Sequence, residues 1–463
     1  MDTVALNQAI AALRKKGHSL VAGDDVGERH SVDFTAENAL RPEAVLRPGS
    51  VREVAEILKV CNGLGQPVVV QGGMTGLAGG ATPQAGELAL SLERLTGIEE
   101  LDEASMTISA QAGTPLQVLQ EAAEQAGFLL PLDFGARGSC HIGGAIATNA
   151  GGNQVIRFGM TRNLVLGLEA VLADGTVISS MNKMLKNNAG YDLKQLFIGT
   201  EGTLGVITRC VLRLLPRLAS TCTALCAVDS FPQAAKLLRE LQSRLGGSVS
   251  AFELMWADYF HRVIDHGDSL RSPFAEGYPM YALIEAEGPD RQADEARFEA
   301  ALGRALESGV IADAAIARSV SDRQSFWAIR DGVAEITAGL TPYASLDVSM
   351  DIGEMAGFVD EFDRELKKAL PDAISLVFGH IGDNNLHLLV STRRHRDLDT
   401  IFDIGYRLTG AHRGSVSAEH GIGVLKRGYL HYSRSPEELA LMRRLKKALD
   451  PKDILNRGRV IPG

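Results

Sequence analysis

Pro67-Val-Val-Val-Gln-Gly-Gly-Met-Thr-Gly-Leu-Ala-Gly-Gly80 is the stretch of this sequence that decides its fold. Residues 67–71 are a short apolar run rich in valine, which predicts a buried strand. The glycine-rich residues after it predict a loop whose successive backbone N–H groups could hold a pyrophosphate, although such a loop is also compatible with a purely structural turn. The loop lacks the GxGxxG pattern and the chain has no GxxxxGK[ST], so Rossmann and P-loop folds are excluded.

Length and composition indicate a globular protein of several domains. The chain has 463 residues, 45% of them hydrophobic, which allows two or three domains with large cores. A net charge of −10 argues against nucleic acid as the main partner, because phosphate binding needs clustered Lys and Arg. Five cysteines without CxxC spacing predict reduced thiols in a cytoplasmic protein. We expect neither an export signal nor a transmembrane segment, since no apolar run reaches ~18 residues.

Further glycine-rich segments follow in the first half of the chain. They are Gly138-Ser-Cys-His-Ile-Gly-Gly144, Thr148-Asn-Ala-Gly-Gly152 and Gly199-Thr-Glu-Gly-Thr-Leu-Gly205. Around them, β-rich and helical runs alternate up to residue 216. The pattern predicts a helix over 116–126, a β-hairpin over 164–178 that turns at Asp174-Gly175, and a strand over 205–215.

Beyond residue 216 the pattern predicts a second domain with an antiparallel sheet. Strands are expected over 223–228, 280–286, 345–350, 374–378 and 386–390, and helices over 230–241, 291–307 and 353–369. We therefore expect four parts: an N-terminal helical lead-in (1–37), a first domain (38–216), an α+β second domain (217–405) and a mostly helical C-terminal segment (406–463).

Two glycine-punctuated turns carry histidines and carboxylates, Gly379-His-Ile-Gly-Asp-Asn-Asn-Leu-His387 and Ala418-Glu-His-Gly-Ile-Gly423. If a hairpin closes at the first turn, His380 and His387 point to one place. Two histidines alone would more often be core or surface residues. With Glu419, the two histidines make a ligand set for one divalent metal that leaves coordination positions open, and His420 is expected to act as a base beside this metal. By itself this set also fits a hydrolytic metal site.

The order of these segments resembles the FAD-binding oxidases of the vanillyl-alcohol oxidase type. From about residue 38 to 463, the chain is similar to FAD-linked D-2-hydroxyacid dehydrogenases, which include D-lactate, glycolate and D-2-hydroxyglutarate dehydrogenases. The similarity is greatest to the D-2-hydroxyglutarate branch, through residues 131–144 and 190–199. The resemblance implies an α+β protein: a two-subdomain FAD-binding domain, a substrate domain with an antiparallel sheet, and a helical C-terminal segment that returns to the FAD.

The resemblance also implies residues that hold FAD noncovalently. The pyrophosphate is expected on Gly72, Gly73, Met74, Thr75, Gly76 and Leu77. The rest of the cofactor is expected to contact Pro131, Gly138, Ser139, Ile142, Gly143, Gly144, Thr148, Gly152, Glu201, Gly205, Ile207 and Asn456. The pyrophosphate loop has no histidine for covalent attachment, and Cys140 and His141 are expected to pack beside the flavin.

In the chemistry that the resemblance implies, His380, His387 and Glu419 bind zinc, manganese or another divalent ion. A 2-hydroxy acid chelates the ion, which lowers the pKa of its hydroxyl. His420 then removes the hydroxyl proton while hydride passes to flavin N5. Arg330 is expected to clamp a substrate carboxylate, the alternative being an exposed helix arginine in a salt bridge. Asn385 is expected to contact the substrate or to orient a ligand.

The expected substrate is D-2-hydroxyglutarate or a relative such as D-lactate or D-malate. D-2-hydroxyglutarate enzymes are expected to carry polar or basic residues for the distal carboxylate where this chain has Ala334, Ser345 and Leu389, which favours a less charged side chain. An O₂-using oxidase and a flavin-binding electron-transfer subunit are the other candidates. The resemblance further implies a homodimer and an electron acceptor that is an electron-transfer flavoprotein or a quinone.

Overall fold

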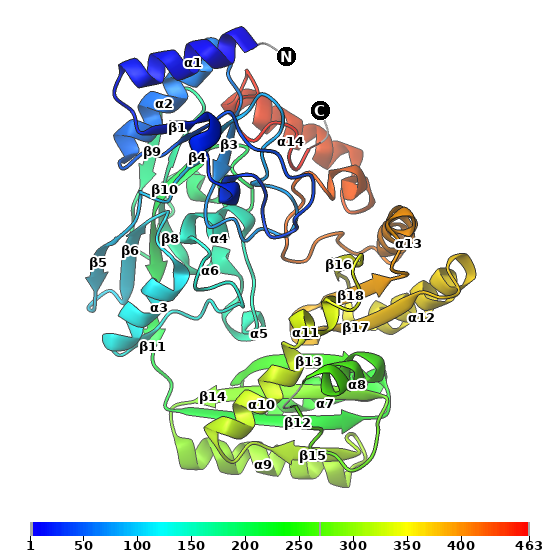
Figure 1. The fold of residues 1–463 in the computed structure, drawn as a ribbon. Helices are drawn as coiled ribbons and strands as arrows, with labels where there is room; N and C mark the ends of the chain where they lie inside the picture. Colours follow the sequence, from blue (N-terminus) through cyan, green and yellow to red (C-terminus); the bar gives the residue numbers. More distant parts are fainter. Residues whose placement is uncertain (1–2, 268–269, 462–463) are drawn as a thin grey trace. The chain divides into compact units, whose positions relative to one another are not determined.

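The computed structural model describes residues 3–267 and 270–461, which fold into two compact units (Figure 1). The first unit contains the chain up to Gly152, Gly159–Arg217, and the chain from Glu419 onward. The second unit contains Asn153–Phe158 and Leu218–Ala418. The boundary expected after residue 405 lies at Ala418 instead. A Cβ at Gly405 would lie 2.4 Å from Leu346 Cδ2, so the helix around Gly405 packs directly on a strand of the second unit.

The first unit has two main sheets. In a four-stranded sheet of order β1-β2-β4-β3, β2, β4 and β3 run parallel and β1 is antiparallel to β2. A five-stranded antiparallel sheet has the order β5-β6-β10-β8-β9, and β7 pairs with β11. The strands are β1 (Leu20–Ala22), β2 (Ala44–Leu46), β3 (Val68–Gln71), β4 (Leu88–Ser91), β5 (Ile98–Asp102), β6 (Thr107–Gln111), β7 (Phe128–Leu129), β8 (Val165–Val171), β9 (Val177–Ser180), β10 (Val206–Arg213) and β11 (Leu215–Pro216). The helices are α1 (Thr3–Lys15), α2 (Val51–Leu64), α3 (Leu116–Gln125), α4 (Ile142–Thr148), α6 (Thr161–Leu164) and α14 (Pro436–Leu449).

Local sequence signals explain several of these elements. The valine run forms β3, and the predicted helix at 116–126 is α3. The predicted hairpin is β8–β9, in which Val171 pairs with Val177 and Asp174-Gly175 lies at the turn. These predictions are confirmed.

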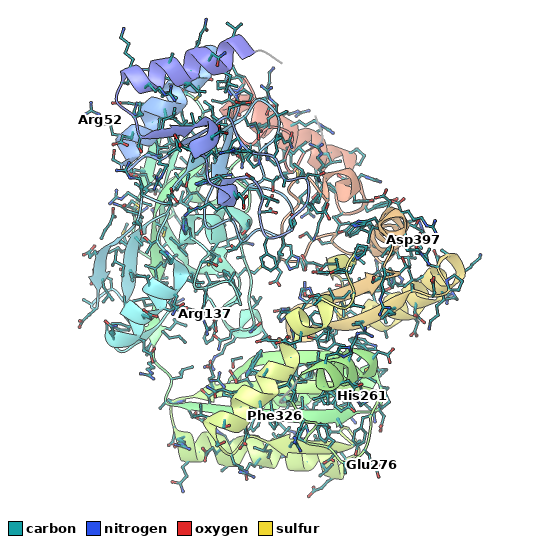
Figure 2. All side chains as sticks on the ribbon, in the orientation of Figure 1. Arg52, Arg137, His261, Glu276, Phe326 and Asp397 are labelled. Carbon is teal, nitrogen blue, oxygen red and sulfur yellow. The ribbon has the colours of Figure 1, made fainter. Side chains whose placement is uncertain are left out.

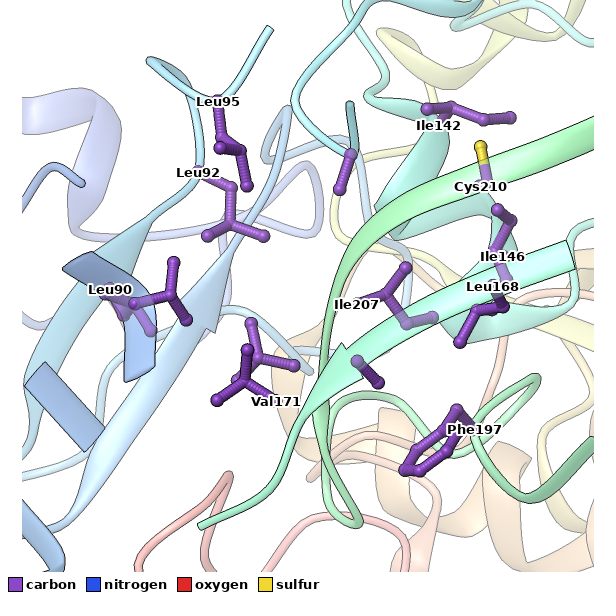
Figure 3. Packing of buried hydrophobic residues seen from close by; sticks show 14 of the residues in the cluster. Leu90, Leu92, Leu95, Ile142, Ile146, Leu168, Val171, Phe197, Ile207 and Cys210 are labelled. Carbon is purple, nitrogen blue, oxygen red and sulfur yellow. The ribbon is translucent and has the colours of Figure 1, made fainter. Parts of the chain in front are cut away.

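Helix α4 is fixed on the five-stranded sheet by apolar packing (Figure 3). Ile142 and Ile146 of α4 share one buried cluster with Leu168 on β8 and with Ile207 and Cys210 on β10. Burying an isoleucine side chain stabilises a fold by about 1.5–3 kcal/mol. The glycines at the start of α4 are therefore held by a rigid part of the core.

The second unit is built on one seven-stranded sheet of order β15-β12-β14-β13-β17-β18-β16, in which every neighbouring pair is antiparallel. This is the α+β domain that the sequence predicts. Its strands are β12 (Ser220–Val228), β13 (Val249–Trp256), β14 (Met280–Gly288), β15 (Asp313–Ile316), β16 (Ala344–Ser349), β17 (Ile374–His380) and β18 (Asn385–Ser391). Its helices are α5 (Val155–Phe158), α7 (Phe231–Leu245), α8 (Ala257–His266), α9 (Arg291–Glu307), α10 (Val320–Arg330), α11 (Val333–Thr337), α12 (Ile352–Ala369) and α13 (Leu398–Ala411).

Helix α10 lies across the sheet of the second unit (Figure 1). Phe326, labelled on α10 in Figure 2, belongs to a buried cluster with Tyr259 of α8, Phe378 of β17 and Leu389 of β18. This packing brings the C-terminal end of α10, and with it Arg330, onto the sheet.

Two further predictions concern the whole described chain. None of its described helices combines the length and apolar character needed to cross a membrane. All five cysteines are buried with free thiols, so the described residues contain no disulfide.

Candidate active site

The glycine-rich loop after β3 turns against the segment that precedes α4. A Cβ on Gly73 would lie 2.1 Å from the Ser139 carbonyl oxygen and 2.9 Å from Cys140 Cα, so this approach requires glycine. Met74 has a left-handed φ of 59°. Within 3–267 and 270–461, no group accepts a hydrogen bond from the backbone N–H of residues 73–77. A row of such unpaired donors is an anion-binding nest.

The start of α4 lies beside this loop and leaves space next to it. A Cβ on Gly72 would lie 3.7 Å from His141 Cβ, whereas a Cβ on Gly144 would meet no atom within 4 Å. His141 Nδ1 is buried and has no hydrogen-bond partner in the described structure. Burial lowers the pKa of His141, which favours a neutral ring. Unpaired donors, open space over Gly144 and an orphaned ring nitrogen together fit a bound cofactor with a phosphate and polar edges.

Glu201 and Asn456, both predicted to contact FAD, bind the backbone of the first unit. Glu201 Oε1 accepts a hydrogen bond from Ile422 N (2.6 Å), and Oε2 accepts one from Gly423 N (2.8 Å). Desolvation raises the pKa of the Glu201 carboxyl. Asn456 Oδ1 accepts from Val70 N (2.8 Å), while its Nδ2 donates to the Glu201 carbonyl oxygen (2.5 Å). Glu201 thus holds the 419–423 turn, and Asn456 joins β3 to the 199–205 loop.

The other residues predicted at the flavin have various structural roles in the first unit. A Cβ on Gly152 would lie 2.2 Å from the Asp133 carbonyl oxygen, and one on Gly205 would lie 2.8 Å from the Phe197 ring. Thr148 Oγ1 donates to a carbonyl of its own helix. Flavin contacts of the following residues stay predictions: Pro131, Gly138, Ser139, Ile142, Thr148, Gly152, Gly205 and Ile207.

In the second unit, β17 and β18 form the predicted hairpin. The 3-10 helix η4 (Ile381–Asp383) closes it, followed by Asn384 with a left-handed φ of 72°. The ring centroids of His380 and His387 are 5.3 Å apart, and the rings meet edge to face. The turn therefore brings the two histidines together, as predicted, and both are more than nine-tenths buried.

Each of these histidines has a buried carboxylate on the adjoining strand. Glu253 of β13 is in register with His380, and its Oε1 lies 2.7 Å from His380 Nδ1. Asp347 of β16 is in register with His387, and its Oδ1 lies 3.9 Å from His387 Nδ1. Desolvation alone would raise the pKa of Glu253, but His380 and then Arg330 outweigh it and hold this pKa below its ordinary value. Sequence reasoning missed both carboxylates, although each is the lone acid of an otherwise uncharged strand.

Arg330, the last residue of α10, is buried rather than exposed, so the alternative of an exposed helix arginine is wrong. Its Nε donates to Glu253 Oε2 at 2.7 Å. Desolvation would lower the pKa of Arg330, but Glu253 raises it above its ordinary value. The guanidinium Cζ lies 4.9 Å from the centroid of the Phe378 ring, and Arg330 Nη2 is 3.4 Å from His380 Nε2. A buried cation thus lies directly beside the histidine pair.

Asn385 supplies a further sign that this face of the sheet suits a bound group. Its Nδ2 donates to Asp347 Oδ1 at 2.7 Å, which leaves the Asn385 Oδ1 buried without a partner in the described structure. Imidazoles backed by carboxylates are the usual surroundings of a metal ion in proteins. The donor set of His380 and His387, with this orphaned oxygen nearby, fits a divalent metal.

Glu419 and His420 follow Ala418, the last residue of the second unit, and open the final segment of the first. The chain that leads to them is held at Asp347: Ala418 N donates to its carbonyl oxygen (3.3 Å), and Ser417 Oγ donates to its Oδ2 (3.2 Å). The roles of Glu419 as ligand and His420 as base stay predictions.

The three positions that depart from the D-2-hydroxyglutarate pattern all lie in the second unit. Ala334 on α11 and Ser345 on β16 are not buried, whereas Leu389 on β18 is 3% exposed and in register with Ser345. Leu389 follows His387 by two residues, so both side chains lie on the same face of the sheet. The face carrying the histidines therefore continues into an apolar row.

Comparison with known proteins identifies the family to which this chain belongs. Residues 42–180 match the model of an FAD binding domain, and residues 217–460 match the FAD linked oxidases, C-terminal domain. The mitochondrial D-2-hydroxyglutarate dehydrogenase of Arabidopsis thaliana is 40% identical over 90% of this chain and 75% of that protein. The D-2-hydroxyglutarate dehydrogenase of Xanthomonas citri pv. viticola is 39% identical over 99% of this chain and 96% of that protein. The structure of p-cresol methylhydroxylase superposes with a TM-score of 0.76 at 15% identity, covering 99% of this chain and 97% of that one, which shows the fold alone.

The FAD binding domain and the superposition show that the chain has an FAD-binding fold of the p-cresol methylhydroxylase type. The chain belongs to the FAD-linked oxidase family, as an FAD-dependent D-2-hydroxyacid dehydrogenase. The predicted fold class, family and flavin cofactor are confirmed. The prediction of a cytoplasmic protein is wrong by the same comparison, because relatives such as those of Arabidopsis thaliana and Bos taurus are named mitochondrial enzymes.

Proposed function

We propose that this dehydrogenase is also metal-dependent and oxidises D-2-hydroxyglutarate or a related D-2-hydroxy acid to the 2-oxo acid. The observation that carries the proposal is the pair of buried imidazoles, His380 and His387, beside the buried cation Arg330 on one sheet face. Such a face is suited to a substrate that offers a hydroxyl and a carboxylate on neighbouring atoms.

Two groups absent from the chain itself complete the chemistry. Bound noncovalently, FAD would supply the redox step by accepting hydride from the substrate C2 at N5. A divalent ion, zinc or manganese, held by His380, His387 and Glu419, would supply Lewis acidity toward the substrate hydroxyl.

The residues of the chain then bind, orient and move a proton. Arg330 binds the substrate carboxylate through the guanidinium nitrogens that Glu253 does not use. Asn385 turns its unpaired Oδ1 to the substrate or to a ligand of the metal. His420, as a neutral imidazole, removes the hydroxyl proton; a general base of this kind contributes about 10²–10⁴-fold to turnover.

Anaerobic bleaching of the flavin tests the proposal directly. We expect D-2-hydroxy acids to bleach the flavin and L-enantiomers not to, and we expect a chelator to abolish bleaching until zinc is returned. His420→Ala should retain FAD and metal but lose about 10²–10⁴-fold in turnover. Bleaching that survives complete metal removal would contradict the metal assignment, and near-normal turnover of His420→Ala would contradict the base.

A less charged substrate such as D-lactate is the second candidate. Three uncharged residues favour this candidate, because none of them could pair with a distal substrate carboxylate: Ala334, Ser345 and Leu389. The S. pombe protein named putative D-lactate dehydrogenase C713.03 is 35% identical over 97% of this chain and 88% of that protein. Comparing bleaching rates for D-lactate, D-malate and D-2-hydroxyglutarate decides between the two substrate classes.

The remaining partners stay predictions. An electron-transfer flavoprotein or a quinone is the proposed acceptor, and slow reoxidation of the reduced flavin by O₂ would separate a dehydrogenase from an oxidase. The homodimer can be checked by light scattering.

A further inference from the structure

One buried carboxylate lies between the groups that the proposed function assigns to metal and substrate. Glu253 Oε1 is 2.7 Å from His380 Nδ1, and Glu253 Oε2 accepts a 2.7 Å hydrogen bond from Arg330 Nε. Glu253 is only 1% exposed. We propose that Glu253 is the positioning residue of the site, setting the tautomer of His380 and the direction of the Arg330 guanidinium together. This inference rests on the proposed function.

The fold fixes the backbone on each side of this carboxylate. Glu253 and His380 are paired residues of the neighbouring strands β13 and β17. The Arg330 carbonyl accepts a 2.7 Å hydrogen bond from the Tyr259 hydroxyl, and Tyr259 stacks on Phe378 at a centroid distance of 4.3 Å. Since the backbones are held by the sheet and by α10, the carboxylate determines how the two side chains point.

The tautomer follows from the chemistry of a carboxylate. An ionised Glu253 only accepts hydrogen bonds, so His380 Nδ1 carries the proton that it shares with Oε1. His380 Nε2 then keeps its lone pair, which is the form of the ring that ligates a metal. Arg330 Nη2 faces the same Nε2 at 3.4 Å, a long contact that an ion at Nε2 would replace. The guanidinium would remain anchored to Glu253 through Nε.

Helix α10 also contacts a second buried carboxylate, on the neighbouring strand β14, which provides a matched control for Glu253. Glu285 on β14 is also 1% exposed; its carboxylate accepts hydrogen bonds from Arg323 Nε (2.7 Å), Arg323 Nη2 (2.8 Å) and Trp327 Nε1 (3.0 Å). Arg323, Trp327 and Arg330 lie at positions i, i+4 and i+7 of α10, so one face of the helix serves both carboxylates. Thr223 Oγ1 is the remaining hydrogen-bond donor to Glu285 in the described chain, so this carboxylate contacts no histidine.

Glu253→Gln separates positioning from packing because it keeps the size of the side chain. A glutamine has one acceptor oxygen for two donors. The charged Arg330 Nε–H competes best for that oxygen, so the amide NH₂ faces His380 Nδ1. His380 then accepts at Nδ1 and carries its proton on Nε2, where the metal lone pair is needed. Glu253→Gln therefore forces the wrong tautomer, whereas Glu285→Gln does not touch the histidines.

The experiment measures the affinity of the metal-free full-length flavoprotein for Zn²⁺ by competition with a chelating dye. Losing a carboxylate that orients a metal ligand typically weakens metal binding by about 10–100-fold. We expect a loss of this size for Glu253→Gln, whereas Glu285→Gln should bind zinc as tightly as wild type does. At saturating zinc, Glu253→Gln should raise KM for the hydroxy acid more than it lowers kcat, because a neutral amide oxygen holds the Arg330 guanidinium more weakly than the carboxylate does. Equal zinc affinities of Glu253→Gln and wild type, or an equal loss in Glu285→Gln, would overturn the inference.

A second pair of variants covers the case in which Glu253→Gln does not fold. Arg330→Met removes the competing donor, so the glutamine side chain of Glu253→Gln/Arg330→Met is free to accept a hydrogen bond from His380 Nδ1. This double variant should bind zinc about tenfold or more tightly than Glu253→Ala/Arg330→Met. Equal affinities of the two double variants would refute the positioning role. A wild-type protein that binds no zinc would instead overturn the metal assignment of the proposed function, so the two failures are distinguishable.

Discussion

Gly144→Ala tests where the flavin lies, because the protein alone has room for a methyl group at this residue, whereas a flavin bound there would not. A Cβ on Gly144 meets no protein atom within 4 Å, although the residue lies beside the glycine-rich loop and is only partly exposed. At the neighbouring Gly143, a Cβ would lie 2.6 Å from Ala112 Cβ and 3.0 Å from its carbonyl oxygen. Gly143 is thus required by the protein, and we expect Gly144 to be required by the cofactor.

The expected magnitudes have opposite signs for the free and the flavin-bound protein. Replacing a helical glycine by alanine raises the free energy of unfolding by about 0.5–1 kcal/mol where the new methyl fits, as it does at Gly144. If FAD fills the open space, the same methyl costs about 1–3 kcal/mol of overpacking in the complex. That cost corresponds to roughly 5- to 150-fold weaker FAD binding. At Gly143, the clash with Ala112 should outweigh the helical gain and destabilise the apoprotein.

The assay is urea unfolding of the apoproteins, followed by titration of each with FAD and detection by flavin fluorescence. Gly144→Ala should unfold at higher urea than wild type yet bind FAD less tightly, and Gly143→Ala should unfold at lower urea. Wild-type FAD affinity in a folded Gly144→Ala protein would refute the placement of the flavin over α4. Destabilisation of apo Gly144→Ala would refute the open space itself.

Three further predictions concern the first unit. Glu201→Ala leaves the backbone N–H groups of Ile422 and Gly423 without their acceptor, which costs about 1–3 kcal/mol for each group where water cannot replace the carboxylate. Urea unfolding should therefore show a loss of about 2 kcal/mol or more in the free energy of unfolding. An unchanged unfolding midpoint would contradict the role of Glu201 in holding the 419–423 turn. Arg459→Met leaves the buried Glu87 carboxylate without the cation that binds both of its oxygens, and should destabilise the protein by about 3–5 kcal/mol in the same assay. The double variant Arg459→Met/Glu87→Leu should regain stability, and a double variant as unstable as Arg459→Met would contradict this explanation. Asp102 has its pKa lowered to about 2, chiefly by a hydrogen bond from Lys183. The stabilisation by ionised Asp102 is therefore present above about pH 4 and is lost as the pH falls toward 2. The difference in unfolding midpoint between wild type and Asp102→Asn should shrink between about pH 4 and pH 2, and should stay constant between about pH 6 and pH 8.

Short-range patterns account for the parts of this protein that the sequence predicts well. The two apolar runs 374–378 and 386–390 on either side of a Gly-Asp-Asn-Asn turn predict the β17–β18 hairpin, and the hairpin alone brings His380 and His387 together. The glycines after β3 likewise predict a loop of free backbone donors, because their chemistry depends on adjacent residues. Such features are local, so one sequence is enough to recognise them.

The carboxylates behind the histidines depend on strand order and register, which a local pattern does not contain. Glu253 is 127 positions from His380 in the chain, and they meet because β13 pairs with β17 in one particular register. A one-residue slip would move Glu253 to the opposite face of the sheet. A charged residue inside an apolar strand was the available signal, since burial of a lone carboxylate requires a partner. The signal indicates that a partner exists, but the sheet topology determines which one.

The charges on this sheet face also bear on the choice of substrate. Glu253 and Asp347 are buried carboxylates and Arg330 is the buried cation beside them, so these three groups together are negative. With the proposed ligand Glu419 included, a divalent ion would bring the sum of these charges to zero, so that one substrate carboxylate could be bound by the ion and Arg330 together. A second carboxylate would need another cation, and neither Leu389 nor its register partner Ser345 carries a charge. Because an unpaired buried carboxylate costs several kcal/mol, this face is the reason why a hydroxy acid with one carboxylate is the second candidate beside D-2-hydroxyglutarate.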